Sequence, residues 1–287
     1  MENKLIGRKF QIDEKIGEGC FGYVCKGHNT KTGEVVAIKI EKPEVLYKVL
    51  KHETSILTYL YQKGCSQLPK IYWYGLWQES TCLVMSYYTH SLHDFYDKKG
   101  ELEPKNMDIL MIQIIDILED IHKHYVLHFD IKPQNFMIKD GELYLIDFGF
   151  SKIYIDENGK HINQGSLYFT GSPKYVSYYN HCGEPASRRD DLISLGYMYL
   201  YLTGSMLPWE NMDVLLETPL EENHIEHPKN KIRREYKSIE NLKKIIEENS
   251  KIGEYLEYCY NLDYDENPDY YLLRRIFTKE EETTKEN

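Results

Sequence analysis

HFDIKPQN at residues 128–135, followed by DFG at residues 147–149, frames the most chemically informative part of this 287-residue sequence. Four polar side chains fall within this span, between and beside the apolar runs NFMI and LYLI: Asp130, Lys132, Asn135 and Asp147. Asparagine and aspartate oxygens suit Mg²⁺, which keeps part of its water shell and shares phosphate oxygens. Asp130 is not required as a ligand and could accept a hydroxyl proton. The two motifs in this order predict a metal and phosphate site, although either motif alone would also fit a solvated loop.

A glycine-rich turn lies near the start of the chain, where Gly17, Gly19 and Gly22 form G-x-G-x-x-G before Val24. A dinucleotide-binding fold uses the same spacing, but at a turn from a strand into a helix. Here the glycines join two predicted strands, FQIDEKIG and YVCKGH, so the loop cannot present a helix N-terminus to a pyrophosphate. We therefore favour a loop that covers phosphates over a dinucleotide site.

Lys39 carries the only charge in the apolar run VVAIKI. An ammonium group in such a strand is costly unless it is paired. Glu53 follows fourteen residues later in a predicted helix and is a natural partner. The pair could hold the phosphates of an anionic ligand. An exposed strand lysine with a solvated glutamate is the alternative.

Hydrophobic periodicity divides the chain into a β-rich and a helical part. Residues 1–86 predict an antiparallel sheet of about five strands. One helix, between Glu44 and Tyr61, is expected to pack on that sheet, because Val45, Val49, Ile56, Leu57 and Leu60 recur at helical spacing. Residues 87–277 predict a helical domain, and residues 278–287, TKEEETTKEN, have the composition of a disordered acidic tail.

Three helices are predicted in the helical part. An apolar stripe indicates a long helix that ends near His124. Further helices are expected over Arg189 to Leu202 and over Ile239 to Tyr260. The run DDLISLGYMYLYLTG is apolar almost all round, so the helix that contains it is expected to be deeply buried.

The charge balance excludes several kinds of partner. The chain has 46 Asp and Glu against 35 Lys and Arg, a net charge of -11 that argues against direct nucleic-acid binding. No stretch approaches the roughly 20 apolar residues of a membrane span. The six cysteines form no C-x-x-C pair and the N-terminus lacks a signal-peptide core. We expect buried cysteines and a soluble, monomeric, intracellular protein, cytoplasmic and with a nuclear role left open.

Taken together in order, these motifs resemble those of a eukaryotic protein kinase from Phe10 to Phe277. GEGCFGYV resembles the glycine-rich loop, VAIK the phosphate-anchoring strand, HFDIKPQN the catalytic loop and DFG the start of the activation segment. The resemblance implies an α+β, two-lobed kinase fold. Its small N-terminal lobe would hold an antiparallel sheet with one main helix, and its larger lobe would be mainly helical.

The resemblance also implies the roles of individual residues, with ATP and Mg²⁺ as cofactors and proteins as substrates. Asp130 would be the catalytic base, Lys132 would contact the transferring phosphoryl group, and Asn135 and Asp147 would hold Mg²⁺. Met85 resembles the gatekeeper, and Ser86, Tyr87 and Tyr88 resemble the hinge that meets adenine. The other implied ATP-site residues are Ile16, Gly17, Glu18, Gly19, Cys20, Phe21, Gly22, Tyr23, Val24, Ala37, Lys39 and Glu53.

SPKYVSYYNHCGEPASRRDDLISLGY at residues 172–197 narrows the resemblance to casein kinase 1, which phosphorylates serine and threonine. The runs LPWE and LDYDENPDYYLLRRIF agree with that family, and the vaccinia-related kinases are the nearest alternative. In this resemblance Asp191 ties the central helix to the catalytic loop. A buried carboxylate needs such partners, because burial without them is costly.

Two departures from the family pattern concern regulation and substrate choice. Phe129 replaces the arginine that usually meets a phosphorylated activation loop, so we expect activity without such phosphorylation. Lys174 replaces an arginine of the family's anion site and loses its bidentate fork. The basic cluster after LPW is replaced by an acidic segment, so the preference for primed or acidic substrates is predicted to be weakened. Its acidic residues are Glu210, Asp213, Glu217, Glu221 and Glu222.

Two alternatives concern the whole protein and its basic run. A catalytically silent scaffold is the competing function, favoured by Phe129 alone, since all six expected polar positions are filled. The basic run is expected to be a solvated helix face or loop, with a nuclear-localisation or docking patch as the alternative. It comprises Lys229, Lys231, Arg233, Arg234 and Lys237.

Overall fold

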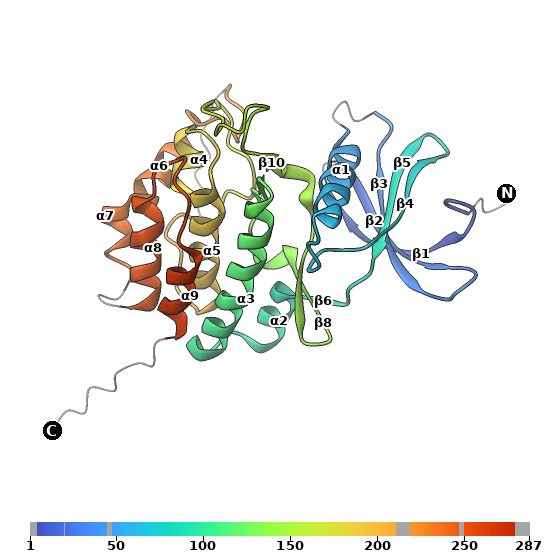
Figure 1. Cartoon of the computed structure of the whole chain (residues 1–287), viewed down its shortest axis with the longest axis horizontal. Helices are drawn as coiled ribbons and strands as arrows, with labels where there is room; N and C mark the ends of the chain where they lie inside the picture. Colours follow the sequence, from blue (N-terminus) through green and yellow to red (C-terminus); the bar gives the residue numbers. More distant parts are fainter. Residues whose placement is uncertain (1–4, 20, 45–47, 211–218, 247–249, 279–287) are drawn as a thin grey trace. The chain divides into compact units, whose positions relative to one another are not determined.

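The computed structural model describes residues 5–19, 21–44, 48–210, 219–246 and 250–278. The chain forms two compact units (Figure 1). The first unit comprises residues 1–94 and 134–151, and the second comprises residues 95–133 and 152–287. The predicted domain limits at residues 86 and 277 stay predictions, and nearly all of the predicted tail, residues 279–287, lies outside the described residues.

An antiparallel sheet dominates the described part of the first unit and has five strands, as predicted (Figure 1). The strands lie in the order β1 (Phe10–Glu18), β2 (Gly22–Asn29), β3 (Val35–Glu41), β5 (Ser80–Ser86) and β4 (Ile71–Trp77). Side chains alternate between the two faces of a strand, so β3 buries Val36, Ile38 and Ile40 in the core of the sheet. The same alternation places Lys39 on the opposite face.

Helix α1 (Val49–Gln62) belongs to the same unit and buries Glu53 along with its apolar stripe. It begins at Val49, later than predicted from Glu44, which lies in a turn. Residues 45–47, which include the predicted Val45, lie outside the described residues. The Glu41 carboxylate of β3 accepts a hydrogen bond from the Leu50 amide at 3.2 Å and so satisfies one of the first-turn donors of the helix.

A smaller sheet contains the two strands that lie between the end of the HFDIKPQN motif and the start of the DFG motif. It contains β6 (His90–Ser91), β8 (Phe136–Lys139) and β9 (Glu142–Leu145). The two-residue turn between β8 and β9 is Asp140-Gly141, and both residues have positive φ, 53° and 84°. Asp-Gly is a favoured pair for such a hairpin turn. The hairpin places Asn135 before one strand and Asp147 shortly after the other.

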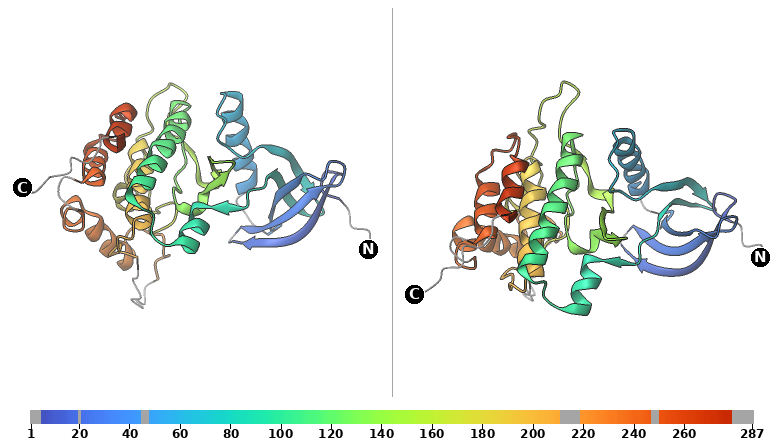
Figure 2. Two further views of the ribbon diagram at one scale, coloured as in Figure 1. Left: turned by 90° about the horizontal axis from the view of Figure 1, so that it is seen from below. Right: turned by 60° about the horizontal axis from the view of Figure 1, so that its bottom comes forward.

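Helices dominate the second unit (Figure 2). They are α3 (Pro104–Lys123), α4 (Tyr178–Cys182), α5 (Arg188–Leu202), α6 (Pro228–Lys237), α7 (Ile239–Leu242), α8 (Lys251–Asn261) and α9 (Tyr270–Thr278). The unit also contains the short antiparallel pair β7 (Val126–Leu127) and β10 (Lys152–Ile153). Helix α2 (Leu92–Lys99) spans the border between the two residue ranges. This combination of sheet and helices confirms the α+β class.

Helix α5 is the centre of the second unit, as predicted. Every residue of α5 except Tyr201 is buried, and helices α3, α4 and α8 pack around it (Figure 2). A Cβ atom on Gly196 would lie 2.3 Å from Leu256 Cδ2, so glycine permits the close approach of α8. The predicted long helix before His124 is also confirmed, because α3 ends at Lys123.

The single helix predicted over Ile239 to Tyr260 is wrong. Helix α7 ends at Leu242, and a separate helix, α8, begins at Lys251. The Ser250 hydroxyl accepts a hydrogen bond from the Gly253 amide and caps the start of α8. Helical periodicity continues through both segments, and the cap that interrupts it is a local interaction that periodicity does not reveal.

The basic run forms α6, and the prediction of a solvated face is wrong for two of its residues. Lys231 is exposed and pairs with Glu226 at 2.9 Å. Arg233 and Lys237 are buried, the latter with no exposed surface. Their stems pack inward because α6 presents one face to the interior of the unit, where backbone carbonyl and amide oxygens replace water.

The described cysteines match the expectation of burial, with Cys25, Cys65, Cys82 and Cys259 buried and Cys182 half-buried. Within the described residues, no helix combines the length and the apolar character that a bilayer crossing requires.

Candidate active site

The Lys39 ammonium group is the centre of a charged cluster in the first unit. Its Nζ donates to both carboxylate oxygens of Glu53, at 2.7 and 2.9 Å, and to Asp147 Oδ1 at 2.8 Å. The Glu53 side chain is 1% exposed and that of Lys39 is 16% exposed. The predicted pair is confirmed, and the solvated alternative is wrong.

Burial and charge act in opposite directions in this cluster. Burial by itself would lower the pKa of Lys39, but Asp147 and Glu53 raise that pKa above its ordinary value and keep the ammonium group charged. Burial raises the pKa of Glu53, and Lys39 opposes that rise. With both carboxylates ionised, the three groups carry one net negative charge, which favours a cation beside Asp147.

A pocket of about 160 Å³ borders this cluster in the first unit. Its lining includes Gly19, Phe21, Gly22, Tyr23, Val24, Lys39, Glu53 and Asp147. The Gly19 amide donates to the Gly22 carbonyl at 2.8 Å and closes the turn between β1 and β2. A Cβ atom on Gly22 would lie 2.0 Å from the Ile40 carbonyl oxygen, so only glycine fits there. The glycines therefore join two strands, and the dinucleotide alternative is wrong.

The remaining predicted nucleotide contacts lie along the strands of the same unit. Ile16, Gly17 and Glu18 end β1, and Ile16 is 47% exposed. Ala37 of β3 pairs with the buried Met85 of β5, which is followed by Ser86, Tyr87 and Tyr88. Cys20 lies outside the described residues. Contacts of these residues with adenine stay predictions.

Asn135 and Asp147 supply oxygen donors that suit Mg²⁺. The Ile146 amide donates to the Asn135 carbonyl at 2.9 Å. This hydrogen bond links the backbone of Asn135 to the residue directly before Asp147. Asp147 has left-handed backbone geometry, with φ at 68°, and its side chain is 42% exposed. One carboxylate and one amide oxygen are the donor types that Mg²⁺ takes beside phosphate oxygens. The residues therefore fit the ion, and their role as ligands stays a prediction.

In the second unit, three donors hold the carboxylate of Asp130, the residue expected to be the catalytic base. The Ser172 amide and hydroxyl each donate to Asp130 Oδ1 at 2.9 Å. Lys132 Nζ donates to Asp130 Oδ2 at 2.6 Å and to the Ser172 hydroxyl oxygen at 3.0 Å. No local pattern marks Ser172 as a partner of Asp130, because it lies 42 residues away and only the fold brings the two together.

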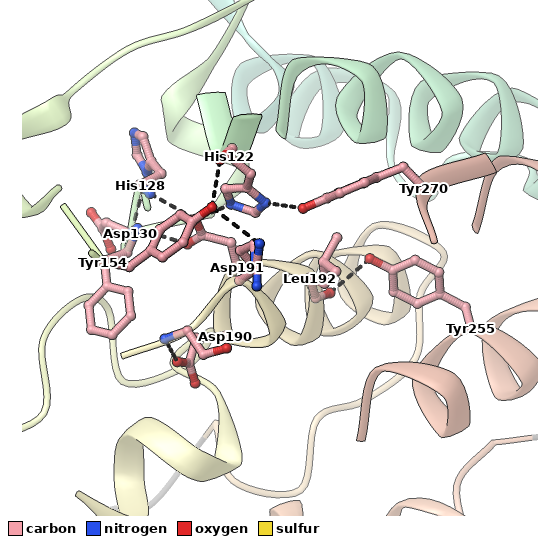
Figure 3. A network of polar contacts seen from close by, with 12 residues as sticks. His122, His128, Asp130, Tyr154, Asp190, Asp191, Leu192, Tyr255 and Tyr270 are labelled. Atoms are coloured by element: carbon pink, nitrogen blue, oxygen red, sulfur yellow. Dashed lines mark hydrogen bonds and ion pairs between the residues drawn. The ribbon is translucent and has the colours of Figure 1, made fainter. Parts of the chain in front are cut away.

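Asp191 connects α5 to the backbone of the HFDIKPQN segment, as the resemblance implied (Figure 3). Its Oδ2 accepts from the His128 amide at 2.7 Å, and its Oδ1 accepts from the Phe129 amide at 2.8 Å. Phe129 has φ at 68°, an uncommon conformation for a bulky residue. The two hydrogen bonds to Asp191 offset that local strain.

His122 and Tyr270 complete this network and were missed by sequence reasoning (Figure 3). His122 Nε2 lies 3.0 Å from Asp191 Oδ2, and its Nδ1 lies 2.6 Å from the Tyr270 hydroxyl. If Nε2–H donates a hydrogen bond to the carboxylate, Nδ1 accepts a hydrogen bond from the Tyr270 hydroxyl. Three buried residues from α3, α5 and α9 therefore set the position of one loop.

Phe129 occupies an apolar position in the second unit. It packs with Leu127 and Tyr154 in a buried cluster. The Lys152 ammonium group lies 4.2 Å from the centroid of its ring, and burial lowers the pKa of Lys152. This position holds a ring and a nearby cation, where the family pattern would place an arginine.

The Lys174 ammonium group pairs with Glu210. It also lies 3.3 Å from the centroid of the Tyr201 ring. Burial lowers the pKa of Lys174, and Glu210 opposes that effect. Of the acidic segment, Glu221 and Glu222 are exposed, whereas Asp213 and Glu217 lie outside the described residues. The chain thus supplies an acidic partner for Lys174 in Glu210.

The sequence of the chain matches a known protein family. The family model for the protein kinase domain matches residues 10–268 of the chain. The matched range contains the pocket, the charged cluster and the catalytic loop.

Proposed function

The chain belongs to the protein kinase family, and on that premise we propose that it is a serine/threonine kinase of the casein kinase 1 type. In this proposal it transfers the γ-phosphoryl group of ATP to serine and threonine hydroxyls of proteins. The observation that carries the proposal is the contact of Lys39 with both Glu53 and Asp147. Kinase activity requires the strand lysine, the helix glutamate and the DFG aspartate to be in place together. A silent scaffold would have no need of this charged cluster.

The residues divide the chemistry between binding and proton transfer. Lys39 would hold the α- and β-phosphates, with Glu53 fixing its ammonium group. Asn135 and Asp147 would hold Mg²⁺, which when bound neutralises phosphate charge. Asp130 would accept the proton of the substrate hydroxyl. As it does so, the hydroxyl oxygen bonds to the γ-phosphorus, and the bond between that phosphorus and the ADP oxygen breaks.

Ser172 and Lys132 prepare Asp130 for this role. Two hydrogen bonds from Ser172 fix the orientation of the carboxylate before a substrate arrives. Lys132 holds its other oxygen and carries a positive charge that would contact the transferring phosphoryl group. Because phosphoryl transfer asks little covalent chemistry of the protein, such positioning and charge are expected to supply most of the rate.

The serine/threonine and casein kinase 1 assignments rest on residues 172–197. Asp191 lies within the run SRRDDL, and its carboxylate accepts hydrogen bonds from the amides of His128 and Phe129 in the catalytic loop. The vaccinia-related kinases are the alternative within the same family. We also propose that the protein acts as a monomer inside the cell, because its scattered cysteines and acidic composition favour neither disulfide pairing nor nucleic-acid binding.

Phosphate transfer to casein tests the proposal. The purified wild-type chain with Mg·ATP should phosphorylate casein, and Lys39→Met and Asp130→Asn should each lower kcat by about 100-fold or more. Lys31→Met, at an exposed turn in the same unit as Lys39, is the matched control and should match wild type. Phosphoserine and phosphothreonine are the expected products.

Two outcomes would contradict it. Equal inactivity of folded wild type and variants would support the scaffold, and phosphotyrosine as the main product would remove the serine/threonine assignment.

Substrate choice follows from the pairing of Lys174 with Glu210. Because Glu210 already neutralises this lysine, a phosphate or carboxylate on the substrate must compete with it. A peptide array should therefore show weak selection for phosphoserine or acidic residues upstream of the acceptor. Glu210→Gln should strengthen that selection by releasing Lys174. Strong selection by the wild-type chain would refute this expectation.

A further inference from the structure

Lys237 is a fully buried lysine at the end of α6, with an exposed fraction of 0%. Among the described residues, no carboxylate forms an ion pair with it. Its Nζ instead donates to the carbonyl oxygens of Pro173, at 2.9 Å, and Val176, at 2.6 Å. The ammonium group also lies 5.0 Å from the Tyr197 ring centroid and 5.2 Å from that of Trp209.

This environment is unfavourable for a charge. Burial lowers the pKa of Lys237 well below its ordinary value, and the nearby Arg233 lowers it further. Ring faces and carbonyl dipoles return only part of the lost hydration. An apolar side chain of the same length would avoid this cost. What it could not do is donate hydrogen bonds to the carbonyls of Pro173 and Val176.

These two carbonyls belong to a tight turn that begins at Ser172. The amides of Tyr175 and Val176 donate to the Ser172 carbonyl at 2.8 and 2.9 Å. Trp209 Nε1 donates to the Lys174 carbonyl at 2.8 Å. Buried side chains therefore bind three carbonyls of the turn from within the second unit.

Ser172 connects this turn to the catalytic loop. Its amide and hydroxyl bind Asp130 Oδ1, and its hydroxyl oxygen accepts from Lys132. A displacement of the turn would move both donors away from Asp130. A continuous series of hydrogen bonds thus connects the Lys237 ammonium group, through the turn at residues 172–176, to the Asp130 carboxylate.

We propose that Lys237 is a positioning residue for phosphoryl transfer, which fixes the turn at residues 172–176 and through it the orientation of Asp130. This inference rests on the proposed function, because it assigns the lysine to the reaction for which Asp130 is the base. The partners of Lys237 named above belong to the second unit and the pocket belongs to the first unit, so nucleotide binding is expected to stay unchanged.

The test compares Lys237→Met with Lys231→Met, an exposed lysine of the same helix. Lys237→Met should lower kcat for casein on the order of 10- to 100-fold, because misplacement of a reacting group by about 1 Å has such an effect. The KM for ATP should be unchanged. Tm should shift by no more than about 4 °C, since the loss of two hydrogen bonds is offset by removal of a buried charge. Lys231→Met should match wild type in all three measurements.

A double-mutant cycle tests the route through Ser172. Ser172→Ala alone should lower kcat, and Ser172→Ala with Lys237→Met should lower it little further, because both act on the same contact. Independent, multiplying effects would overturn the proposal. So would a Lys237→Met variant with wild-type kcat, or one whose kcat loss comes with an equal change in the KM for ATP.

Trp209→Phe provides a second variant if Lys237→Met does not fold. It retains a ring and removes only the donor to the Lys174 carbonyl. Its kcat should fall several-fold with the KM for ATP unchanged, and a wild-type kcat would overturn the proposal. An inactive wild-type chain would instead reject the proposed function itself, so the two failures are distinguishable.

Discussion

At the scale of single residues, Phe129 shows how a substitution changes what a position can do. An arginine there would carry a cation toward the activation segment, whereas Phe129 is buried with Leu127 and Tyr154. Lys152 lies over its ring and is itself partly desolvated. A phosphate would find no guanidinium at this position, and the strained backbone of Phe129 is already held by Asp191.

Activity of the purified chain should therefore be insensitive to phosphatase treatment. Phe129→Arg should lower the free energy of unfolding by roughly 3 to 5 kcal/mol, because it buries a second cation beside Lys152. Urea unfolding measures this change, and Leu167→Arg, at an exposed apolar residue of the same unit, should have little effect. Loss of activity after phosphatase treatment would contradict the first expectation, and a stable Phe129→Arg variant would contradict the second.

At the scale of elements, strand β3 positions helix α1 twice. Lys39 binds Glu53 in the second turn of the helix, and two residues further along the strand Glu41 accepts from the Leu50 amide. Glu41 is buried and also lies 3.7 Å from the Lys48 ammonium group. The strand thus replaces the side-chain cap that Lys48, at the N-cap, does not provide.

Glu41→Ala should remove this cap at a cost of about 1 kcal/mol. Because α1 carries Glu53, the KM for ATP should rise about 5-fold, the factor that corresponds to about 1 kcal/mol. Steady-state kinetics with varied ATP measure the change. Glu44→Ala, an exposed glutamate just outside the same helix, is the control. A normal KM for ATP in Glu41→Ala would show that α1 does not depend on the strand.

The sequence predicted those elements whose pattern is local. Alternation identified the strands of the sheet, and the Lys39–Glu53 contact followed from a charge in an apolar strand that needs a partner. Ser172, His122 and Lys237 could not be found in this way, because their partners lie 42, 69 and 61 or more residues away. Polar residues that face one another only after folding leave no period in the sequence. The basic run misled for the same reason, since a helix with five cations has no pattern that marks two of them as buried.

At the scale of the whole molecule, buried charge concentrates in the second unit. Arg188, Arg189, Asp190 and Asp191 all lie buried in the first turn of α5, and Lys237 is buried on α6. Each requires hydrogen bonds in place of water, and burial without full compensation reduces stability. The stability of the protein should therefore depend on whether the Asp190 carboxyl group is ionised.

Asp190 gives this dependence a sign. Burial raises the pKa of Asp190 to about 6, although Ser177 and the Ser187 amide donate to its carboxylate. Since the pKa of aspartate in the unfolded chain is about 3.9, the folded state binds the proton more tightly. The stabilisation from this group is complete below about pH 4 and is lost as pH rises through about 6.

Asp190→Asn should remove that loss, because asparagine does not titrate. The free energy of unfolding of the variant, relative to wild type, should rise between pH 4 and pH 7 by up to about 3 kcal/mol, at about 1.4 kcal/mol per unit of pKa difference. Urea unfolding at each pH measures the difference, and Asp263→Asn, at an exposed loop position of the same unit, is the control. A difference that stays constant across this range would show that Asp190 has an ordinary pKa in the folded protein. A difference that falls with pH would mean that its hydrogen bonds outweigh its burial.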